Sequence, residues 1–292
     1  MSIPRIAFVI PAYNAADSVA AAVRSAREQT VPADEIIVVD DGSIDDTAAV
    51  AAAAGARVIK RTNGGPGAAR NLGIQSTTAE WIALLDADDL ARPDRLAVQR
   101  EHLADAGVAV LHSARGVPAL HTMEPPSVLD FAALWLRNRI CTSTVMLRRS
   151  AWEAVGGFDE ARSLIGVEDY NLWLRLAHAG WKFTWLEQVL VDYLPSAASL
   201  SMQCERIANA ELSNTARVGE VLHLPPAMLL EKEFQLYCEY GVELFHRGER
   251  KVAREFFRAA AARGRLGWRS RLRLWAATLA VPPLRRSPNP SR

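Results

Sequence analysis

The stretch that decides the fold is Arg5-Ile-Ala-Phe-Val-Ile10, which runs directly into Pro11-Ala-Tyr-Asn14. Its apolar run is too short for a spanning helix or a secretory leader and stops at a proline, so it predicts a buried β-strand. Similar runs recur along the first part of the chain, at Glu35–Val39, Arg57–Lys60, Trp81–Leu85 and Val108–His112. Together the five runs predict the strands of one sheet.

Helical patterns separate most of these runs. Residues 17–29 place apolar side chains at helical spacing, and residues 46–54 are rich in alanine. Residues 93–106 begin with Pro93, which suits the first turn of a helix. Alternation of strands and helices predicts an α/β fold in which a mainly parallel sheet is covered by helices on both faces.

The chain beyond residue 113 divides less regularly, beginning with an irregular, proline-containing segment at 114–128. After it we expect a strand at 144–148 and a short helix at 150–157 that is opened by the capping box Ser150–Glu153. An amphipathic helix at 168–179 and two short strands at 182–186 and 189–193 should follow. Residues 231–246 and 249–263 predict a helical hairpin. One tetratricopeptide-like unit is a weak repeat signal, so a plain hairpin packed on the main domain is preferred.

Composition excludes several classes of protein. Half of the 292 residues are hydrophobic, which is enough for a large core and argues against disorder. No stretch reaches the ~20 apolar residues of a spanning helix, so we expect a cytoplasmic protein. The three cysteines are far apart and form no C-x-x-C pair, which argues against a disulfide scaffold or a zinc ribbon.

Chemically suggestive residues follow three of the predicted strands. They are Pro11-Ala-Tyr-Asn14, Asp40-Asp-Gly-Ser43 and Asp86-Ala-Asp-Asp89. The carboxyl ends of parallel strands meet at one edge of a sheet, where ligands bind in open α/β folds. Converging carboxylates suit a hard divalent cation, Mn²⁺ or Mg²⁺, which commonly bridges them to substrate phosphates. Each motif alone is equally consistent with a turn or a helix cap, and only their coincidence favours a ligand site.

The ordered set of motifs over residues 4–200 resembles the family 2 glycosyltransferases, which have the Rossmann-like GT-A fold. The matching segments are Val9–Asn14, Val38–Thr47, Asn63–Asn71, Leu85–Asp89 with Pro93-Asp94, Gly157–Glu160, and Glu168-Asp169. Each segment is short, but their order together is highly specific. The resemblance implies inverting transfer of a sugar from a nucleotide-diphosphate sugar to the hydroxyl of a glycan or lipid-linked acceptor, in the synthesis of cell-surface polysaccharide or glycolipid.

The resemblance also implies a role for each matching residue. The donor would contact Pro11, Ala12, Tyr13, Asp41, Arg70, Asp86, Ala87 and Asp88. Asp88 would ligate the cation, with Asp89 as a second candidate. Glu168, Phe158 and Asp159 would lie on the acceptor side. Asp169 would be the general base, although an acid at the start of a helix also has a plain dipole explanation.

The glycine-rich segment 63–71 supports part of this assignment physically. Gly64, Gly65 and Gly67 permit close approach of the backbone to a ligand, and Arg70 beside them suits phosphate recognition, unless the segment is only a flexible loop. The segment lacks G-x-G-x-x-G spacing, and we expect it not to lead directly from a strand into a helix. Both points argue against a dinucleotide fingerprint.

Two departures from the family pattern limit the expectation. The stretch Tyr193–Ser201 lacks the histidine that many relatives have there, which puts a third metal or diphosphate ligand in doubt. Gln203-Cys-Glu-Arg206 is followed by Ile207, not by the tryptophan of processive synthases. We therefore expect transfer of one sugar per encounter, not polymerisation.

Charge is distributed unevenly along the chain. Residues 247–292 carry a net +11 and the rest a net −10. We expect a transferase domain at 1–202, with donor half 1–113 and acceptor half 114–202, a helical extension at 203–264 and a basic tail at 265–292. The tail, with Trp268 and Trp275, suits peripheral attachment to the inner face of the cell membrane, or a solvated helix packed on the body. No nucleic-acid-binding module is recognisable.

Two rival functions remain to be weighed. A nucleotidyltransferase that makes nucleotide sugars would share the sheet and the cation, but it usually carries a glycine-rich, basic signature where this chain has Pro11–Asn14. A non-enzymatic adaptor with a degenerate catalytic domain would not be expected to keep the full set of acidic residues. The sequence leaves the donor base, the sugar and the acceptor open.

Overall fold

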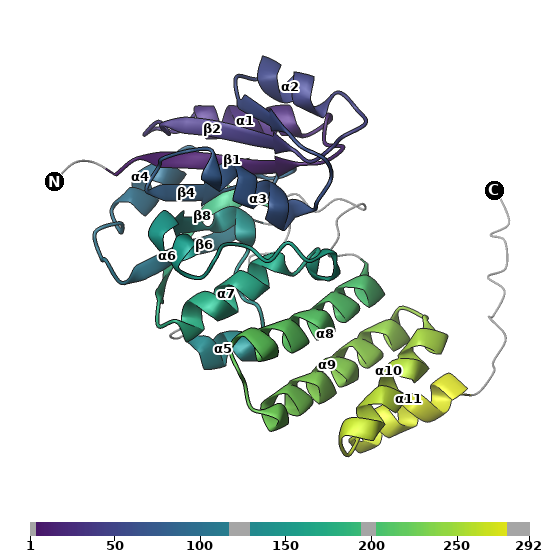
Figure 1. The fold of residues 1–292 in the computed structure, drawn as a ribbon. Helices are drawn as coiled ribbons and strands as arrows, with labels where there is room; N and C mark the ends of the chain where they lie inside the picture. The colour runs from purple at the N-terminus through teal and green to yellow at the C-terminus, as the bar shows by residue number, and fades with distance from the viewer. Residues whose placement is uncertain (1–3, 117–128, 194–202, 279–292) are drawn as a thin grey trace, which may run out of the picture.

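An eight-stranded sheet forms the centre of the computed structural model, which describes residues 4–116, 129–193 and 203–278 (Figure 1). Its strands are β1 (Ile6–Ala12), β2 (Glu35–Asp40), β3 (Arg57–Lys60), β4 (Trp81–Leu84), β5 (Leu90–Ala91), β6 (Val108–Gly116), β7 (Met146–Arg148) and β8 (Lys182–Asp192). They are arranged in the order β3-β2-β1-β4-β7-β6-β8-β5. Only β5 and β7 run against the others, so the predicted α/β fold with a mainly parallel sheet is confirmed.

Helices cover both faces of this sheet. Before residue 193 they are α1 (Val19–Arg27), α2 (Thr47–Ala53), α3 (Pro66–Gln75), α4 (Arg95–Arg100), α5 (Phe131–Leu136), α6 (Arg149–Ala154) and α7 (Glu168–His178), with short 3₁₀ turns η1 (Thr142–Thr144) and η2 (Arg162–Leu164). Side chains of β1 alternate between the two faces, as the pleat requires. Ile6, Phe8 and Ile10 pack with α1 and α2, whereas Ala7 and Val9 pack with α3 and α7.

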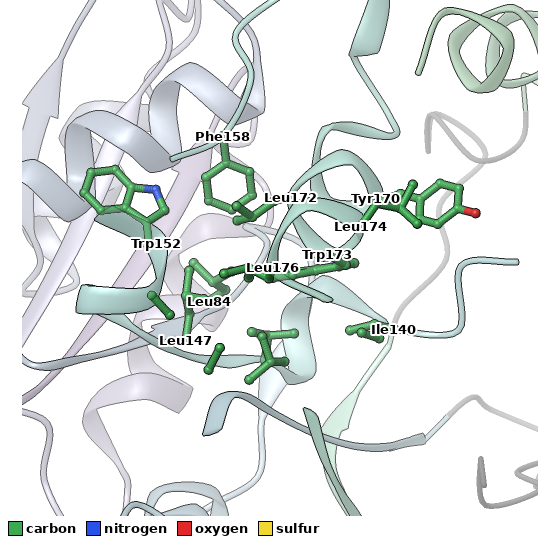
Figure 2. Close-up of a cluster of buried hydrophobic side chains, with 14 of the residues drawn as sticks. Leu84, Ile140, Leu147, Trp152, Phe158, Tyr170, Leu172, Trp173, Leu174 and Leu176 are labelled. Carbon is green, nitrogen blue, oxygen red and sulfur yellow. The ribbon is translucent and has the colours of Figure 1, made fainter. Parts of the chain in front are cut away.

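The helix α7 is anchored along its length in the larger core. Figure 2 shows Leu172, Trp173 and Leu176 of α7 against Leu84 of β4 and Leu147 of β7. All five side chains are fully buried. Burying one such side chain contributes roughly 1.5–3 kcal/mol, so the position of α7 is strongly determined. Its first residues, Glu168 and Asp169, are therefore held at a fixed place beside the sheet.

Four further helices continue the chain, namely α8 (Cys204–Val221), α9 (Pro226–His246), α10 (Arg250–Arg263) and α11 (Trp268–Thr278). Figure 1 shows them stacked beyond α7, with α11 farthest along the chain. A second, smaller core forms around Leu244 of α9 and Phe257 of α10, and Cys204 and Ala208 at the start of α8 belong to it. In contrast, Ala210 and Val218 of α8 belong to the core of the sheet domain. Helix α8 thus contributes to both cores, and the domain boundary expected at residue 202 stays a prediction.

The structure corrects the expectation for the glycine-rich segment. It follows β3 and leads directly into α3, which begins at Pro66. Gly65 has φ +93°, a conformation that glycine adopts readily, and Pro66 needs no amide partner in the first helical turn. Glycine and proline at its start hid this helix from the sequence pattern. The missing G-x-G-x-x-G spacing still separates the segment from a dinucleotide fingerprint.

Several element boundaries also differ from expectation. Residues 182–192 form one strand, β8, whose register against β6 shifts near Leu186 and Val189, which explains why two strands were expected. The helix α6 begins at Arg149 with no side-chain cap, so the expected capping box at Ser150 is wrong. The helix α4 ends at Arg100, six residues early. The irregular segment expected at 114–128 lies largely outside the described residues.

Candidate active site

The loops that follow β1 and β2 are joined to each other by hydrogen bonds. The Asp41 amide donates to the Ala12 carbonyl at 2.8 Å, and the Asn14 amide donates to Ser43 Oγ at 2.9 Å. In return, Asn14 Oδ1 accepts the Ile44 amide at 3.0 Å. Asn14 has φ +48°, which asparagine tolerates better than most residues. The two loops therefore form one surface at the carboxyl edge of the sheet.

Tyr13 stands out on this surface because its side chain is 53% exposed. The neighbouring Pro11 is half-buried, and Ala12 is 3% exposed. An exposed ring on two rigid loops is suited to stacking against a flat group such as a nucleobase.

Asp41 holds the glycine-rich turn in place. Its carboxylate accepts the amides of Gly64 at 2.9 Å and Gly65 at 2.7 Å, and it pairs with Arg61 Nε at 3.2 Å. Only 3% of Asp41 is exposed. The visible role of Asp41 is thus to position the turn, and its contact with a donor stays a prediction.

Arg70 links the acidic loop after β4 to the start of α7. Its guanidinium donates to Asp86 at 2.7 Å and to Glu168 at 2.6 Å, and it lies 5.6 Å above the ring centre of Phe158. Burial opposes its charge, but the two carboxylates outweigh burial and raise the pKa of Arg70. In this structure Arg70 is 4% exposed and holds two acids in place, and its expected contact with a donor stays a prediction.

The acidic loop after β4 presents two of its three carboxylates. The Asp86 side chain is 35% exposed and Asp88 is half-buried, whereas Asp89 is 1% exposed and its charge acts on the buried Arg95. Ala87 between them is buried. Burial, followed by the charge of Asp86, raises the pKa of Asp88. The burial of Asp89 argues against it as a metal ligand.

This carboxylate pair fits a cation that is completed by a substrate. No group of three histidine, cysteine or acidic side chains within residues 4–116, 129–193 and 203–278 forms a metal site by itself. A Mg²⁺ or Mn²⁺ ion held by one or two carboxylates, with diphosphate and water as its other ligands, needs no such group. It would also relieve the repulsion from Asp86, which adds to the effect of burial in raising the pKa of Asp88.

Asp169 lies at the start of α7 with its carboxylate directed to a hydroxyl. Thr142 Oγ1 donates to it at 2.5 Å, and the Tyr170 amide donates at 2.6 Å. Burial and then the charge of Glu168 raise the pKa of Asp169 to about 6, although Thr142 and Arg70 oppose the shift. A raised pKa of this kind suits a general base, which works best when its pKa is close to the operating pH.

Glu168 has a different environment from its neighbour. It is 6% exposed, and its two oxygens accept Arg70 and the Gly166 amide at 2.6 and 2.7 Å. Asp169 is half-buried. Of the two adjacent acids, Asp169 is thus the one more open to a substrate.

The turn η1 contributes two residues that the sequence did not suggest. Besides Thr142, which holds Asp169, Ser143 Oγ accepts the amide of Asp86 at 3.1 Å. This contact arises because β7 is antiparallel to β4, so the start of β7 meets the end of β4. The run Thr142-Ser-Thr144 before a strand is the only sign of these residues in the sequence. It predicts no contact with Asp86 unless the direction of β7 is known.

Two residues expected on the acceptor side have structural contacts. Phe158 is 2% exposed beneath Arg70, and its carbonyl accepts the side-chain amide of Asn71. Asp159 pairs with Arg217 of α8 at 2.6 Å. Their visible role is to support Arg70 and α8. The segment without the expected histidine, Tyr193–Ser201, lies outside the described residues except for Tyr193 itself.

Two solved structures are similar in fold to this chain. The mannosyltransferase PcManGT from Pyrobaculum calidifontis, in complex with GDP-Man and Mn²⁺, has a TM-score of 0.64 at 21% identity and covers 95% of this chain and 81% of that chain. S. aureus TarS in complex with UDP-GlcNAc has a TM-score of 0.62 at 16% identity, over 88% and 81%. At such identities the likeness shows the fold alone, which is the GT-A fold.

Sequence comparison identifies the family. The succinoglycan biosynthesis protein ExoO of Rhizobium meliloti (strain 1021) is 45% identical over 114 residues, 37% of this chain, and the chain spans only 33% of that protein. The model of Glycosyl transferase family 2 matches residues 7–152, half of the chain, including the loops after β1, β2 and β4. With its motifs in order on a GT-A sheet, the chain belongs to glycosyl transferase family 2.

Proposed function

We propose that this glycosyltransferase transfers a sugar from a nucleotide-diphosphate sugar to an acceptor hydroxyl with inversion at the anomeric carbon. One observation carries the proposal. Asp169, a half-buried carboxyl with a pKa of about 6, is linked through Glu168, Arg70 and Asp86 to the acidic loop expected to hold the donor. This linkage supports a base and a donor site on two sides of one buried arginine.

The donor is proposed to lie along the edge formed by the loops after β1, β2 and β4. Tyr13 would stack on the base, Asp41 and the glycine turn would line the ribose and diphosphate, and Asp86 would bind the ribose or sugar. Backbone atoms of Pro11, Ala12 and Ala87 complete this edge. The two structural neighbours, which are complexes with GDP-Man and with UDP-GlcNAc, support a nucleotide-diphosphate sugar as the donor class.

The base is proposed to act without a covalent intermediate. Asp169 would accept the proton of the acceptor hydroxyl, and the acceptor oxygen would then attack the anomeric carbon opposite the departing diphosphate. A single displacement inverts the configuration and needs no nucleophilic carboxylate. Glu168 supports this view because Arg70 and Gly166 already occupy both of its oxygens. Retention of configuration in the product, observed by NMR, would contradict the proposal.

A divalent cation, Mn²⁺ or Mg²⁺, is proposed to be held by Asp88 together with the donor diphosphate. It would neutralise the charge that develops on the leaving diphosphate. We expect Asp88→Asn to lower transfer on the order of 10²-fold, since the cation supplies several kcal/mol of stabilisation. Electron paramagnetic resonance with Mn²⁺ and a nucleoside diphosphate should show weaker metal binding. If Asp88→Asn binds Mn²⁺ as well as the parent does, Asp88 is not the metal ligand. The matched control is Asp94→Asn, which makes the same change at an exposed side chain.

Thr142 gives a test of the base that does not abolish it. Thr142→Val removes the hydroxyl that donates to Asp169 while keeping the side-chain shape. Loss of one hydrogen bond to a carboxylate should raise the apparent pKa by about one unit. Because Asp169 acts as a base, the acidic limb of kcat/KM should move from about pH 6 to higher pH. An acidic limb that does not move would show that another group controls it.

The acceptor is proposed to be a glycan or a lipid-linked sugar used in cell-surface polysaccharide or glycolipid synthesis. The name of ExoO, a succinoglycan biosynthesis protein, supports this class. Work in the cytoplasm at the inner face of the membrane would bring the enzyme to such an acceptor. Screening donor hydrolysis over a panel of nucleotide sugars, with and without Mn²⁺, tests the function. Absence of hydrolysis or transfer with every nucleotide sugar would contradict it.

A further inference from the structure

The helix α11 exposes a row of large apolar side chains. Trp268, Leu272 and Trp275 are 70%, 56% and 59% exposed. Their spacing of four and three residues places them on one face of the helix. Leu274 and Ala277 lie on the other side, where Leu274 packs on the core of α9 and α10 and Ala277 is 8% exposed. The exposed row, which we name the Trp–Leu–Trp stripe, therefore lies on the side of α11 opposite the one that packs on α9 and α10.

Positive charge borders this stripe on both sides. At 100° per residue, Arg271 falls on one flank of the stripe and Arg269 on the other. Both are exposed, and the guanidinium of Arg269 lies 5.1 Å above the ring centre of Trp268. The sequence has no aspartate or glutamate after Glu255. An exposed apolar row between arginines matches a surface that is anionic at its boundary and apolar beneath.

A groove beside the stripe has the same mixed character. It has a volume of about 460 Å³ and lies between α11 and the loop before it. Arg265 and Arg271 line it together with Leu266, Leu274 and Trp275. Guanidinium groups next to apolar side chains suit a phosphate that is attached to an acyl chain.

We propose that α11 is the membrane-docking surface of this enzyme and binds a bilayer of anionic phospholipids. The Trp–Leu–Trp stripe enters the headgroup region, and Arg265, Arg269 and Arg271 contact the lipid phosphates. No helix among residues 4–116, 129–193 and 203–278 is long and apolar enough to cross a membrane. The purpose of docking rests on the proposed function, since it would bring Asp169 to a lipid-linked acceptor, but the binding itself requires no catalysis.

Co-sedimentation of the full chain with vesicles tests the docking surface. We expect binding to vesicles of phosphatidylcholine with phosphatidylglycerol, weakened by salt, and much less binding to phosphatidylcholine alone. Arg269→Glu with Arg271→Glu should weaken partition at least about 25-fold, since each basic residue contributes about fivefold. Leu272→Ser should weaken it about fivefold.

Matched controls separate this surface from general charge and hydrophobicity. Arg24→Glu with Lys60→Glu makes the same charge change on the sheet domain, and Leu230→Ser makes the same apolar change at a side chain that is 48% exposed on α9. Both should bind vesicles nearly as well as the parent. Circular dichroism and the melting temperature should show that every variant is folded.

Three outcomes would overturn the proposal. The first is that the parent protein does not bind anionic vesicles. The second is that the control variants weaken vesicle binding as much as the α11 variants do. The third is that the protein forms a dimer, which Leu272→Ser dissociates, and does not bind vesicles. Donor hydrolysis is measured on the same samples. If the parent protein hydrolyses the donor but does not bind vesicles, only the docking surface is rejected. If it binds vesicles but hydrolyses no donor, only the proposed catalysis is rejected.

Discussion

Asp169→Asn is expected to lower sugar transfer by about 10²- to 10⁴-fold while donor binding stays close to that of the parent. The amide keeps the size of the side chain but cannot accept the proton of the acceptor hydroxyl. The proposed donor contacts lie on the other side of Arg70, so the change should appear in kcat with little effect on the dissociation constant of the donor. Stopped-flow or steady-state kinetics, with calorimetry of nucleotide binding, measure the two effects separately.

The control for this variant is Asp94→Asn, which makes the same chemical change at the exposed start of another helix, α4. It should leave transfer unchanged. A variant Asp169→Asn that retains more than a tenth of the parent activity would show that another group serves as the base. Equal losses of donor affinity and turnover would instead place Asp169 on the donor side.

Arg70→Met is expected to destabilise the protein by about 3–5 kcal/mol, because it leaves a buried carboxylate without its cation. The Glu168 side chain is 7% exposed and cannot be rehydrated without movement of α7, whereas the Asp86 side chain is 35% exposed and can be. The midpoint of urea unfolding should therefore fall with little change in slope. Activity should also be lost, since Glu168 and Asp86 would no longer be held together.

A second change distinguishes a stranded charge from lost packing. Adding Glu168→Gln to Arg70→Met should restore much of the stability, since the buried group is then neutral, but it should not restore transfer. The matched control is Arg92→Met, whose ion pair with Asp192 has side chains 43% and 42% exposed and should cost less than about 1 kcal/mol. Equal destabilisation by Arg70→Met and Arg92→Met would contradict the role of burial.

Much of the sheet could be predicted from the sequence because its strands are continuous apolar runs between helices. The strand Arg57–Lys60 has the expected bounds, and the buried β1, β2 and β4 differ by one or two residues. The helix α3 was hidden because its first turn contains Pro66 and two glycines, residues that usually mark loops. The two-residue strand β5 is too short to produce any period, and its pairing with β8 depends on contacts across the fold.

The sequence points to candidate residues for the site but not to the contacts between them. The motifs brought Asp41, Asp88, Arg70 and Asp169 to attention, yet spacing along the chain could not show that Arg70 binds Asp86 and Glu168, which are 16 and 98 residues away. Nor could it show that the Asp41 carboxylate accepts hydrogen bonds from the amides of the glycine turn. The sequence does not point to Thr142 and Ser143, because their contacts with Asp169 and Asp86 depend on the antiparallel direction of β7.

The adjacency of Thr142 and Ser143 has a consequence for engineering hybrid enzymes. Thr142 donates to Asp169 from the same segment, so a graft of residues 129–193 from a relative would import the proposed base together with its own support. Two hydrogen bonds that hold Asp86 and Glu168 would then have to be recreated across the junction, Ser143 with the Asp86 amide and Glu168 with Arg70. Recombination libraries that preserve these two contacts could exchange the proposed acceptor half while leaving the proposed donor half untouched.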